Sequence, residues 1–308
     1  MYNTKYSMKY MGEEWHVCRA NLNTHTNLSD GLLAPDLTSF LYSDDDAIAI
    51  TDNGRCQDRE ALKDAFKTII PAVEWTVPGP RDTKVTLLVY GVPDGFAHCP
   101  SSLDEAFSMA ADVGALCYVA HPHKSGLRSR ELLEIGRFDG IEIYNAEARL
   151  VGKEYSLNTW DNLIDGGMLN CRGIATDGFL HPRSFRCGWT MLCTKDDTAP
   201  SILDAMRNGR FYSSQGPVFH SISYTNRHFH ADFSDAEEAL LIGNTPHVPE
   251  SGNMIIGRVE GFPWTGEVFE EPVREIDADL SFWTNATYVR CQIRDKLGRY
   301  AWSQPFAL

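Results

Sequence analysis

Histidine, aspartate and glutamate residues recur in this chain where short apolar runs end. Glu74 ends the run PAVE, His121 follows ALCYVA, and Asp177 follows GIAT. His25 stands among small polar residues in NLNTHTNLSDG, residues 21–31. Imidazole nitrogens combined with carboxylate oxygens are the mixed ligands typical of Zn, Mn and Fe sites. The residue types therefore predict a metal site, provided that the fold brings these side chains together.

The segment 21–31 has two interpretations. Asn23 precedes His25 by two residues, and alternate residues of a strand point to the same side. A histidine at position 23 would complete a two-histidine clasp for a metal ion, but the sequence has asparagine. Asparagine and the sequence Ser-Asp-Gly that contains Asp30 are also ordinary turn residues. Both a metal-site remnant and a turn remain open.

The elements that must position these side chains alternate between strands and helices. Apolar runs at 47–51, 85–92, 115–120, 140–144 and 173–176 have the length and flanking turn signals of buried parallel strands. Helical spacing is present at 58–69, 130–136, 154–164 and 200–209. A further helix is predicted to begin at Ser102, with Glu105 completing a capping box. This alternation predicts an α/β domain whose active site lies at the carboxyl ends of the strands.

The last third of the chain has a different pattern. Period-two segments at 217–224, 254–259, 278–285, 287–295 and 299–303 predict half-buried strands, and DKLG at 295–298 predicts a hairpin turn. We therefore expect a barrel-like domain at 1–216 and a small β-sandwich at 217–308.

The bulk composition restricts the partners. The chain has 308 residues, of which 43% are hydrophobic and 23% charged, with a formal net charge of −14. This charge argues against a nucleic-acid partner, and no apolar run is long enough for a membrane span. The N-terminal segment lacks the apolar core of a signal peptide, and the eight cysteines form no C-x-x-C pair. We expect buried free thiols and a cytoplasmic protein.

Taken together and in order, these segments resemble the motifs of the PHP (polymerase and histidinol phosphatase) family of metal-dependent phosphoesterases. ANLNTHTNLSDG resembles the first motif of that family, AIAITDN the second, PAVEW its glutamate motif, AHPH its third histidine motif and GIATDGFLH its last. The resemblance covers about residues 15–217. It implies a distorted (β/α)7 TIM-like barrel and a centre that holds up to three divalent ions.

The resemblance also implies a ligand set, to be read at the matching positions of this chain. The first ion would take Asn23, His25, Glu74 and Asp177, the second Glu74, Tyr90 and His121, and the third Asp30, Asn53 and His181. Each set has lost about one nitrogen ligand relative to the family pattern. Asparagine is a poorer ligand than imidazole for Zn, so the resemblance predicts one or two ions of Mn, Fe or Zn at reduced affinity.

The predicted roles follow from these sets. The metal ligands are His25, Glu74, His121 and Asp177, while Asp30 and His181 hold a second ion or move protons; the side chains lining the site are Asn23, Asn53, Tyr90, His123, Lys124 and Arg128. Among these, Lys124 and Arg128 would bind a phosphate group. The histidines at 220, 228 and 230 are expected on the surface of the strands of the second domain.

Two functions of different classes follow. The first is a metal-dependent hydrolase of a small soluble phosphate ester, in which metal-activated water attacks phosphorus. The second is a non-catalytic PHP-like binding protein whose metal site has decayed. The loss of imidazoles is compatible with both.

Overall fold

The computed structural model describes residues 6–58, 62, 67–244, 253–260, 272–281, 283 and 286–308, the strand at 253–260 by its backbone alone. The strands are β1 (Tyr6–Tyr10), β2 (Glu13–Thr24), β3 (Ala47–Ile50), β4 (Thr68–Pro78), β5 (Lys84–Tyr90), β6 (Leu116–Val119), β7 (Gly140–Asn145), β8 (Arg172–Thr176), β9 (Trp189–Thr194), β10 (Phe211–Ser214), β11 (Phe219–Thr225), β12 (His228–Ala236), β13 (Glu238–Asn244), β14 (Asn253–Glu260), β15 (Val273–Asp279), β16 (Tyr288–Arg294), β17 (Tyr300–Ser303) and β18 (Phe306–Ala307). The α-helices are α1 (Pro35–Leu41), α2 (Leu103–Asp112), α3 (Ser129–Ile135), α4 (Leu157–Asp165) and α5 (Ala199–Arg207), and the 3₁₀ turns are η1 (Pro80–Asp82), η2 (Ala146–Val151) and η3 (Pro182–Ser184).

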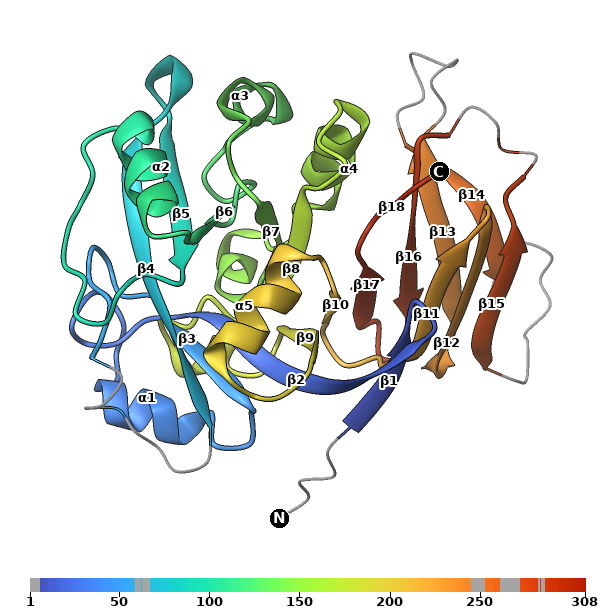
Figure 1. The fold of residues 1–308 in the computed structure, drawn as a ribbon, viewed down its shortest axis with the longest axis horizontal. Coiled ribbons are helices and arrows are strands. Elements are labelled where there is room, and N and C mark those ends of the chain that lie inside the picture. Colours follow the sequence, from blue (N-terminus) through green and yellow to red (C-terminus); the bar gives the residue numbers. More distant parts are fainter. Residues whose placement is uncertain are drawn as a thin grey trace.

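The described residues between Glu13 and Ser214 form a mixed α/β unit around one curved sheet (Figure 1). Its strands lie in the order β8-β7-β6-β5-β4-β3-β2-β9-β10. The strands β2, β3 and β4 run parallel to one another, as do β6, β7 and β8. No ladder joins β8 to β2 among the described residues, but a single parallel bridge pairs Thr24 with Phe179. A closed (β/α)7 barrel therefore stays a prediction.

Two predicted elements differ in the structure. The strand expected at 85–92 as one of a parallel set is β5, which runs antiparallel to both β4 and β6 because the turn at Gly79–Thr83 folds β4 and β5 into a hairpin. The helix expected at 58–69 is wrong at its end, since Thr68 and Ile69 begin β4. Most of its other residues lie outside the described part of the chain. The other four predicted helices are confirmed as α2, α3, α4 and α5.

The helix α2 begins where its capping residue predicts. The Ser102 side chain accepts a hydrogen bond from the backbone N–H of Glu105, and the Glu105 carboxylate accepts one from the backbone N–H of Ser101. Ala106, Phe107 and Ala110 form the buried face, which packs against β4 and β6. None of the described helices is long and apolar enough to cross a membrane.

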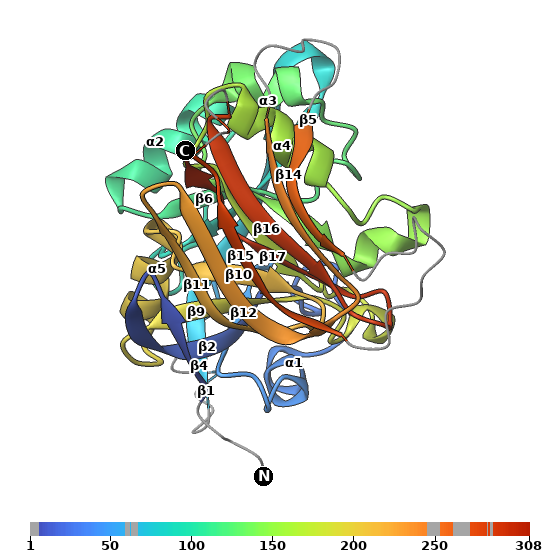
Figure 2. The ribbon, with the colours of Figure 1, turned by 90° about the vertical axis from the view of Figure 1, so that its right-hand side faces the viewer.

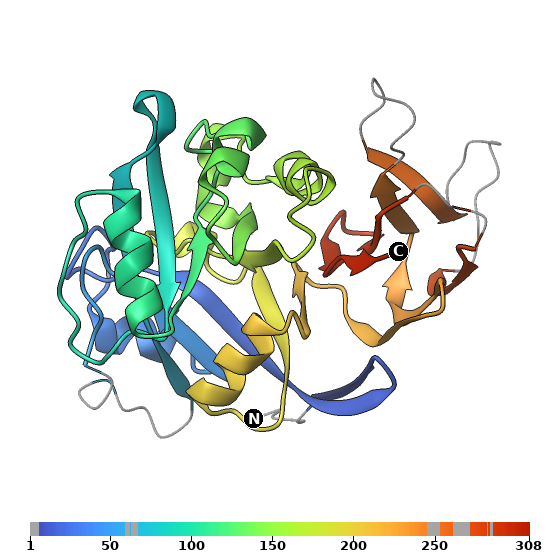
Figure 3. The ribbon, with the colours of Figure 1, turned by 45° about the horizontal axis from the view of Figure 1, so that its top comes forward.

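The C-terminal strands form two facing sheets beside this unit, as the orange and red ribbon of Figure 3 shows. One sheet pairs β1, β11, β12 and β15, and the other pairs β14, β13, β16 and β17. Phe219, Phe229, Leu241, Ile276 and Val289 belong to the core between them. A strand was predicted at 278–285, but the strand in this region, β15, ends at Asp279. The turn at Asp295–Gly298 joins β16 to β17 as expected.

Hydrogen-bonded strands connect the two parts of the chain. β10 pairs with β17, and β1 pairs with both β2 and β11. The predicted boundary at residue 216 falls between β10 and β11. Because these strand pairs cross the boundary, the two-domain division stays a prediction.

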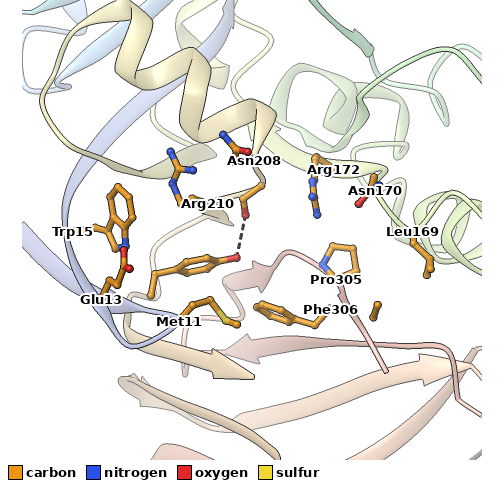
Figure 4. A pocket seen from close by; sticks show the side chains of 13 residues that line it. Met11, Glu13, Trp15, Leu169, Asn170, Arg172, Asn208, Arg210, Pro305 and Phe306 are labelled. Atoms are coloured by element: carbon orange, nitrogen blue, oxygen red, sulfur yellow. Dashed lines mark hydrogen bonds between the residues drawn. The ribbon is translucent and has the colours of Figure 1, made fainter. Parts of the chain in front are cut away.

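Buried side chains also cross between the two parts. Arg290 of β16 donates from Nε and Nη2 to both carboxylate oxygens of Asp161 on α4, each at 2.6 Å, and both side chains are buried. Trp302 of β17 packs with Tyr144 of β7 in the same core cluster. A cleft of about 510 Å³, with Arg172, Arg210 and Phe306 in its lining, also lies between the parts (Figure 4). The Tyr10 hydroxyl donates to the Gly209 carbonyl there.

Candidate metal centre

A small cavity of about 50 Å³ lies where several strands of the curved sheet end. Its lining comes from the ends of β2 and β7, from the middle of β4 and from the segments after β2, β6 and β8: Asn23, His25, Asp30, Glu74, His121, Lys124, Asn145, Gly178 and Leu180. The parallel register places these ends together, because Thr24 pairs with Ile50 and Asn53 bridges to Glu74. Polar groups thus gather at and just after the ends of β2, β6, β7 and β8, but Glu74 lies in the middle of β4 and not at its end as predicted.

His25 is held between two carboxylates. Its Nδ1 lies 3.0 Å from Asp30 Oδ1, and its Nε2 lies 3.5 Å from Glu74 Oε2. Burial lowers the pKa of His25, but hydrogen bonds and the charges of Asp30 and Glu74 outweigh it and raise the pKa to about 10. The same hydrogen bond to His25 lowers the pKa of Asp30 to about 2. In the metal-free protein, the imidazole is therefore a buried cation.

Asp52 fixes the loop that carries Asp30. Its two carboxylate oxygens accept from the backbone N–H and hydroxyl of Thr26, the hydroxyl of Ser29 and the amide of Gln57. Gly31 completes the loop, since a Cβ there would lie 2.4 Å from the carbonyl oxygen of His25. The S-D-G sequence thus builds a turn, and this turn presents Asp30 to Nδ1 of His25.

Asn23 and Glu142 share a buried hydrogen-bond network. The Asn23 amide donates to Glu142 Oε1 at 2.8 Å, and its oxygen accepts from the hydroxyl of Thr51 at 3.0 Å. Glu142 also accepts from the Thr176 hydroxyl at 2.6 Å, the Asn145 amide at 3.0 Å and the backbone N–H of His121 at 2.7 Å. A carboxylate offers about four lone-pair positions, so the carboxylate of Glu142 is fully used.

Both carboxylate oxygens of Asp177 likewise accept hydrogen bonds. It accepts from the Tyr42 hydroxyl and the backbone N–H of Arg186 at Oδ2, and from the N–H groups of Cys187 and Gly188 at Oδ1. Burial raises the pKa of Asp177 to about 6, although these hydrogen bonds oppose the shift. Its ligand role stays a prediction, and it would require giving up hydrogen bonds that the structure contains.

His121 also lines the cavity. Its Nδ1 lies 3.0 Å from the Ser125 hydroxyl, and its backbone has a φ of 32°, a strained value that the hydrogen bond to Glu142 holds in place. Burial lowers the pKa of His121, which favours the neutral ring. A neutral imidazole is the form that binds metal ions.

The other predicted site residues lie outside the cavity, except Lys124, which lines it. Tyr90 is fully buried, and its hydroxyl donates to the Leu22 carbonyl. His123 is exposed beside the carbonyl oxygen of Tyr155, and Arg128 is the exposed residue before α3. His181 is exposed and accepts from the backbone N–H of Arg183.

Asn53 lines a second cavity of about 420 Å³ next to the first. Asp30 and Glu74 line both cavities, so the two adjoin at these carboxylates. Trp75, Cys99 and Pro100 complete the wall of this larger space.

Two donor atoms at the cavity have the spacing that a single ion requires. Two ligands of a tetrahedral zinc ion with bonds of about 2.1 Å lie about 3.4 Å apart, and His25 Nε2 lies 3.5 Å from Glu74 Oε2. The carboxylate on Nδ1 is the orienting partner that metal-binding histidines usually have. In the described part of the chain, however, no three such groups lie close enough together at this cavity to enclose an ion. The residues therefore fit one ion held by His25 and Glu74, with His121 on the same cavity lining, and they do not fit a three-ion centre.

Glu142 and Asp52 were not predicted from the sequence to take part in the site. Glu142 alternates with Ile141 and Ile143 in an apolar strand, which is compatible with either face of a sheet. Asp52 stands in T-D-N, directly after the apolar run 47–51, and no role was predicted for it. A carboxylate inside an otherwise apolar strand needs a partner, and that cost is the signal that could have identified Glu142.

Comparisons with known proteins support the fold. No protein-family model matches the chain, and no curated protein is significantly similar to it. A two-domain protein from Bacteroides vulgatus that contains a predicted PHP-like metal-dependent phosphoesterase aligns with 96% of this chain and 95% of its own, at 14% identity and a TM-score of 0.54. Weaker matches are a candidate metal-dependent phosphoesterase from Bifidobacterium adolescentis and an amidohydrolase from Chromobacterium violaceum that contains sulfate and no metal. The first has 11% identity and a TM-score of 0.43, the second 14% and 0.42, and each covers 53% of this chain and 88% of its own. Over nearly its whole length, the chain thus has the fold of the two-domain PHP-like protein.

Proposed function

We propose that this protein is a metal-dependent hydrolase of a small phosphate ester. The observation that carries the proposal is the pair His25 and Glu74, whose facing atoms lie 3.5 Å apart at the point where the 50 Å³ and 420 Å³ cavities adjoin. His25 and Glu74 would hold the ion, with His121 beside them. One divalent ion of Mn, Fe or Zn would supply an acidified water and neutralise phosphate charge.

The surrounding residues have distinct tasks in this proposal. Asp30 accepts from Nδ1 of His25 and so directs Nε2 towards Glu74. Lys124 is an exposed cation on the lining of the smaller cavity, and its ammonium group can pair with a phosphate oxygen. The larger cavity offers room for the organic part of a small ester.

A specific observation also favours the alternative, a non-catalytic binding protein. Asn23 and Asp177, which the family resemblance places in the first ion set, are both engaged in hydrogen bonds within the protein. A chain that no longer binds metal would keep such a network for stability alone. In that case, the two cavities would bind a ligand without converting it.

Hydrolysis assays separate the two proposals. We expect the purified chain to hydrolyse p-nitrophenyl phosphate or bis(p-nitrophenyl) phosphate when Mn²⁺ is added. Glu74→Gln, which keeps the shape of the side chain, should lower kcat/KM by at least about tenfold. The control His220→Gln alters an exposed histidine of β11 and should leave the rate unchanged. Equal rates in the wild-type and Glu74→Gln proteins, or no metal-stimulated turnover of either ester, would refute catalysis at this site.

A further inference from the structure

A second group of metal-ligating side chains lies on the outer sheet of the C-terminal strands. β12 and β15 run side by side there, on the side of the molecule away from the curved sheet (Figure 2). Both strands alternate between inward apolar and outward polar residues: Phe229, Ala231 and Ile276 are buried. The outward row of β12 is His228, His230 and Asp232, and that of β15 is Glu275, Asp277 and Asp279.

The strand register sets these two rows opposite each other. His228 pairs with Asp279, His230 with Asp277, and Asp232 with Glu275. Directly opposed residues of an antiparallel pair have Cβ atoms about 4.5–5.5 Å apart, so their side chains meet. The backbone pairing of β12 with β15 therefore keeps these side chains close together.

His230 lies at the centre of the group. Its Nδ1 is 3.3 Å from Asp277 Oδ2 and 3.6 Å from Glu275 Oε1, and its Nε2 is 3.3 Å from Asp232 Oδ2. One ligand atom each from His230, Glu275 and Asp277 lies within 4.8 Å of the other two. These separations are close to the spacing of about 3.4 Å that ligands of one tetrahedral ion have. Among the described residues, this is the one set of three such groups that meets this geometry.

The charges of the two rows favour a cation. The six outward side chains comprise four carboxylates and two imidazoles. Asp232 stands directly opposite Glu275, and like charges at opposed positions destabilise a sheet. His228 contacts Asp277, with Nε2 2.9 Å from Oδ1. Two imidazoles carry at most two positive charges against these four carboxylates, so the group attracts a cation.

We propose that His230, Glu275 and Asp277 form a surface site for a divalent transition ion such as Zn²⁺. One imidazole and two carboxylates suit zinc and its neighbours better than calcium or magnesium, which prefer oxygen alone. The site is distinct from His25 and Glu74, and the proposal does not depend on the hydrolase function. Because it joins neighbouring strands, the bound ion stabilises the outer sheet.

Zinc titration tests the site. The protein carries His25→Gln and Glu74→Gln, so that the cavity site does not contribute, and Zn²⁺ binding is measured by calorimetry at pH 7.5. We expect one Zn²⁺ per chain and a rise in melting temperature with zinc. Adding His230→Gln should weaken zinc binding by at least about 10–100-fold. Loss of a residue that only supports a metal ligand already has an effect of this size, and His230 is a ligand in this proposal. Adding His98→Gln instead removes an exposed histidine that pairs with Glu105, and should change nothing.

Two results would overturn the proposal: no zinc bound by the double variant, or equal affinity with and without His230→Gln. The wild-type chain provides a second readout if the variants fold poorly. In its nuclear magnetic resonance spectrum, Zn²⁺ should shift the ring signals of His230 and leave those of His98 in place. Unshifted His230 signals at saturating zinc would contradict the site.

Discussion

Three buried carboxylates, Asp52, Glu142 and Asp177, each accept four hydrogen bonds. Glu74 and Asp30 differ from them, because their principal contact is the imidazole of His25. The first three carboxylates therefore stabilise the structure around the cavity. Glu74 and Asp30 instead line the cavity, where their oxygens can bind a ligand. Position in a motif does not reveal the difference, since all five stand at or near strand ends or in apolar runs.

Substitution of Glu142 tests this division. In Glu142→Gln, one of the two acceptor oxygens becomes an NH₂ donor, so two of the four buried donors lose their acceptor. We expect the free energy of unfolding to fall by about 1–3 kcal/mol in urea denaturation. The control Glu134→Gln alters an exposed glutamate of α3 and should change the free energy of unfolding by less than about 0.5 kcal/mol. Equal losses for Glu142→Gln and Glu134→Gln would show that the hydrogen bonds of Glu142 contribute nothing.

The stability of the metal-free protein should depend on pH through His25. Its pKa is raised from 6.5 to about 10 on folding, so the folded state binds the proton more tightly than the unfolded state. The resulting stabilisation is complete below pH 6.5 and is lost as the pH rises towards 10. Urea denaturation in the presence of a chelator should show this decrease, and His25→Gln should lack it. An unchanged slope in His25→Gln would mean that another group titrates.

At the scale of elements, local signals predicted helix starts well and strand direction poorly. Ser102 and Glu105 lie where a capping box requires, and α2 begins at the next residue after Ser102. The antiparallel direction of β5 was missed, although Gly79, Pro80 and Asp82 between β4 and β5 are turn residues that a hairpin would use. A short apolar run has the same sequence pattern whether its strand is parallel or antiparallel to its neighbours. Only the turn that connects β4 to β5 indicates that these strands are antiparallel.

Removal of the α2 cap gives a quantitative test at this scale. Ser102→Ala deletes the acceptor for the N–H of Glu105 and should lower the free energy of unfolding by about 1 kcal/mol. Ser108→Ala alters an exposed serine within the same helix and should change it by less than about 0.5 kcal/mol. Thermal or urea denaturation of both variants measures the difference. Equal effects would mean that the cap contributes nothing.

At the scale of the whole molecule, side chains shared across the two parts bind them into one structure. The sequence predicted strands and a boundary near residue 216, but periodicity carries no information about which surfaces meet. Arg290 illustrates this: it stands in a strand that reads as half-buried, yet it reaches Asp161 on α4 as a buried ion pair. The same holds for the outer rows of β12 and β15. The histidines at 228 and 230 were correctly predicted on a strand surface, but their carboxylate partners depend on a strand register that the sequence does not specify.

A double-mutant cycle measures the contact between the parts. Arg290→Met leaves Asp161 buried without its cation and should lower the free energy of unfolding by about 3–5 kcal/mol. The combination Arg290→Met with Asp161→Leu should recover much of this loss, because no charge remains buried. Additive losses in the double variant would show that the ion pair does not couple the two parts.

The most direct test of the proposed function is the metal content of the cavity site. The chain is prepared with His230→Gln, so that the outer sheet does not bind an ion, is loaded with Mn²⁺ or Zn²⁺, freed of excess metal and analysed by plasma mass spectrometry. We predict about one ion per chain, and its loss when Glu74→Gln is added. Less than about 0.1 ion per chain after loading, or equal contents with and without Glu74→Gln, would contradict a metal site formed by His25 and Glu74.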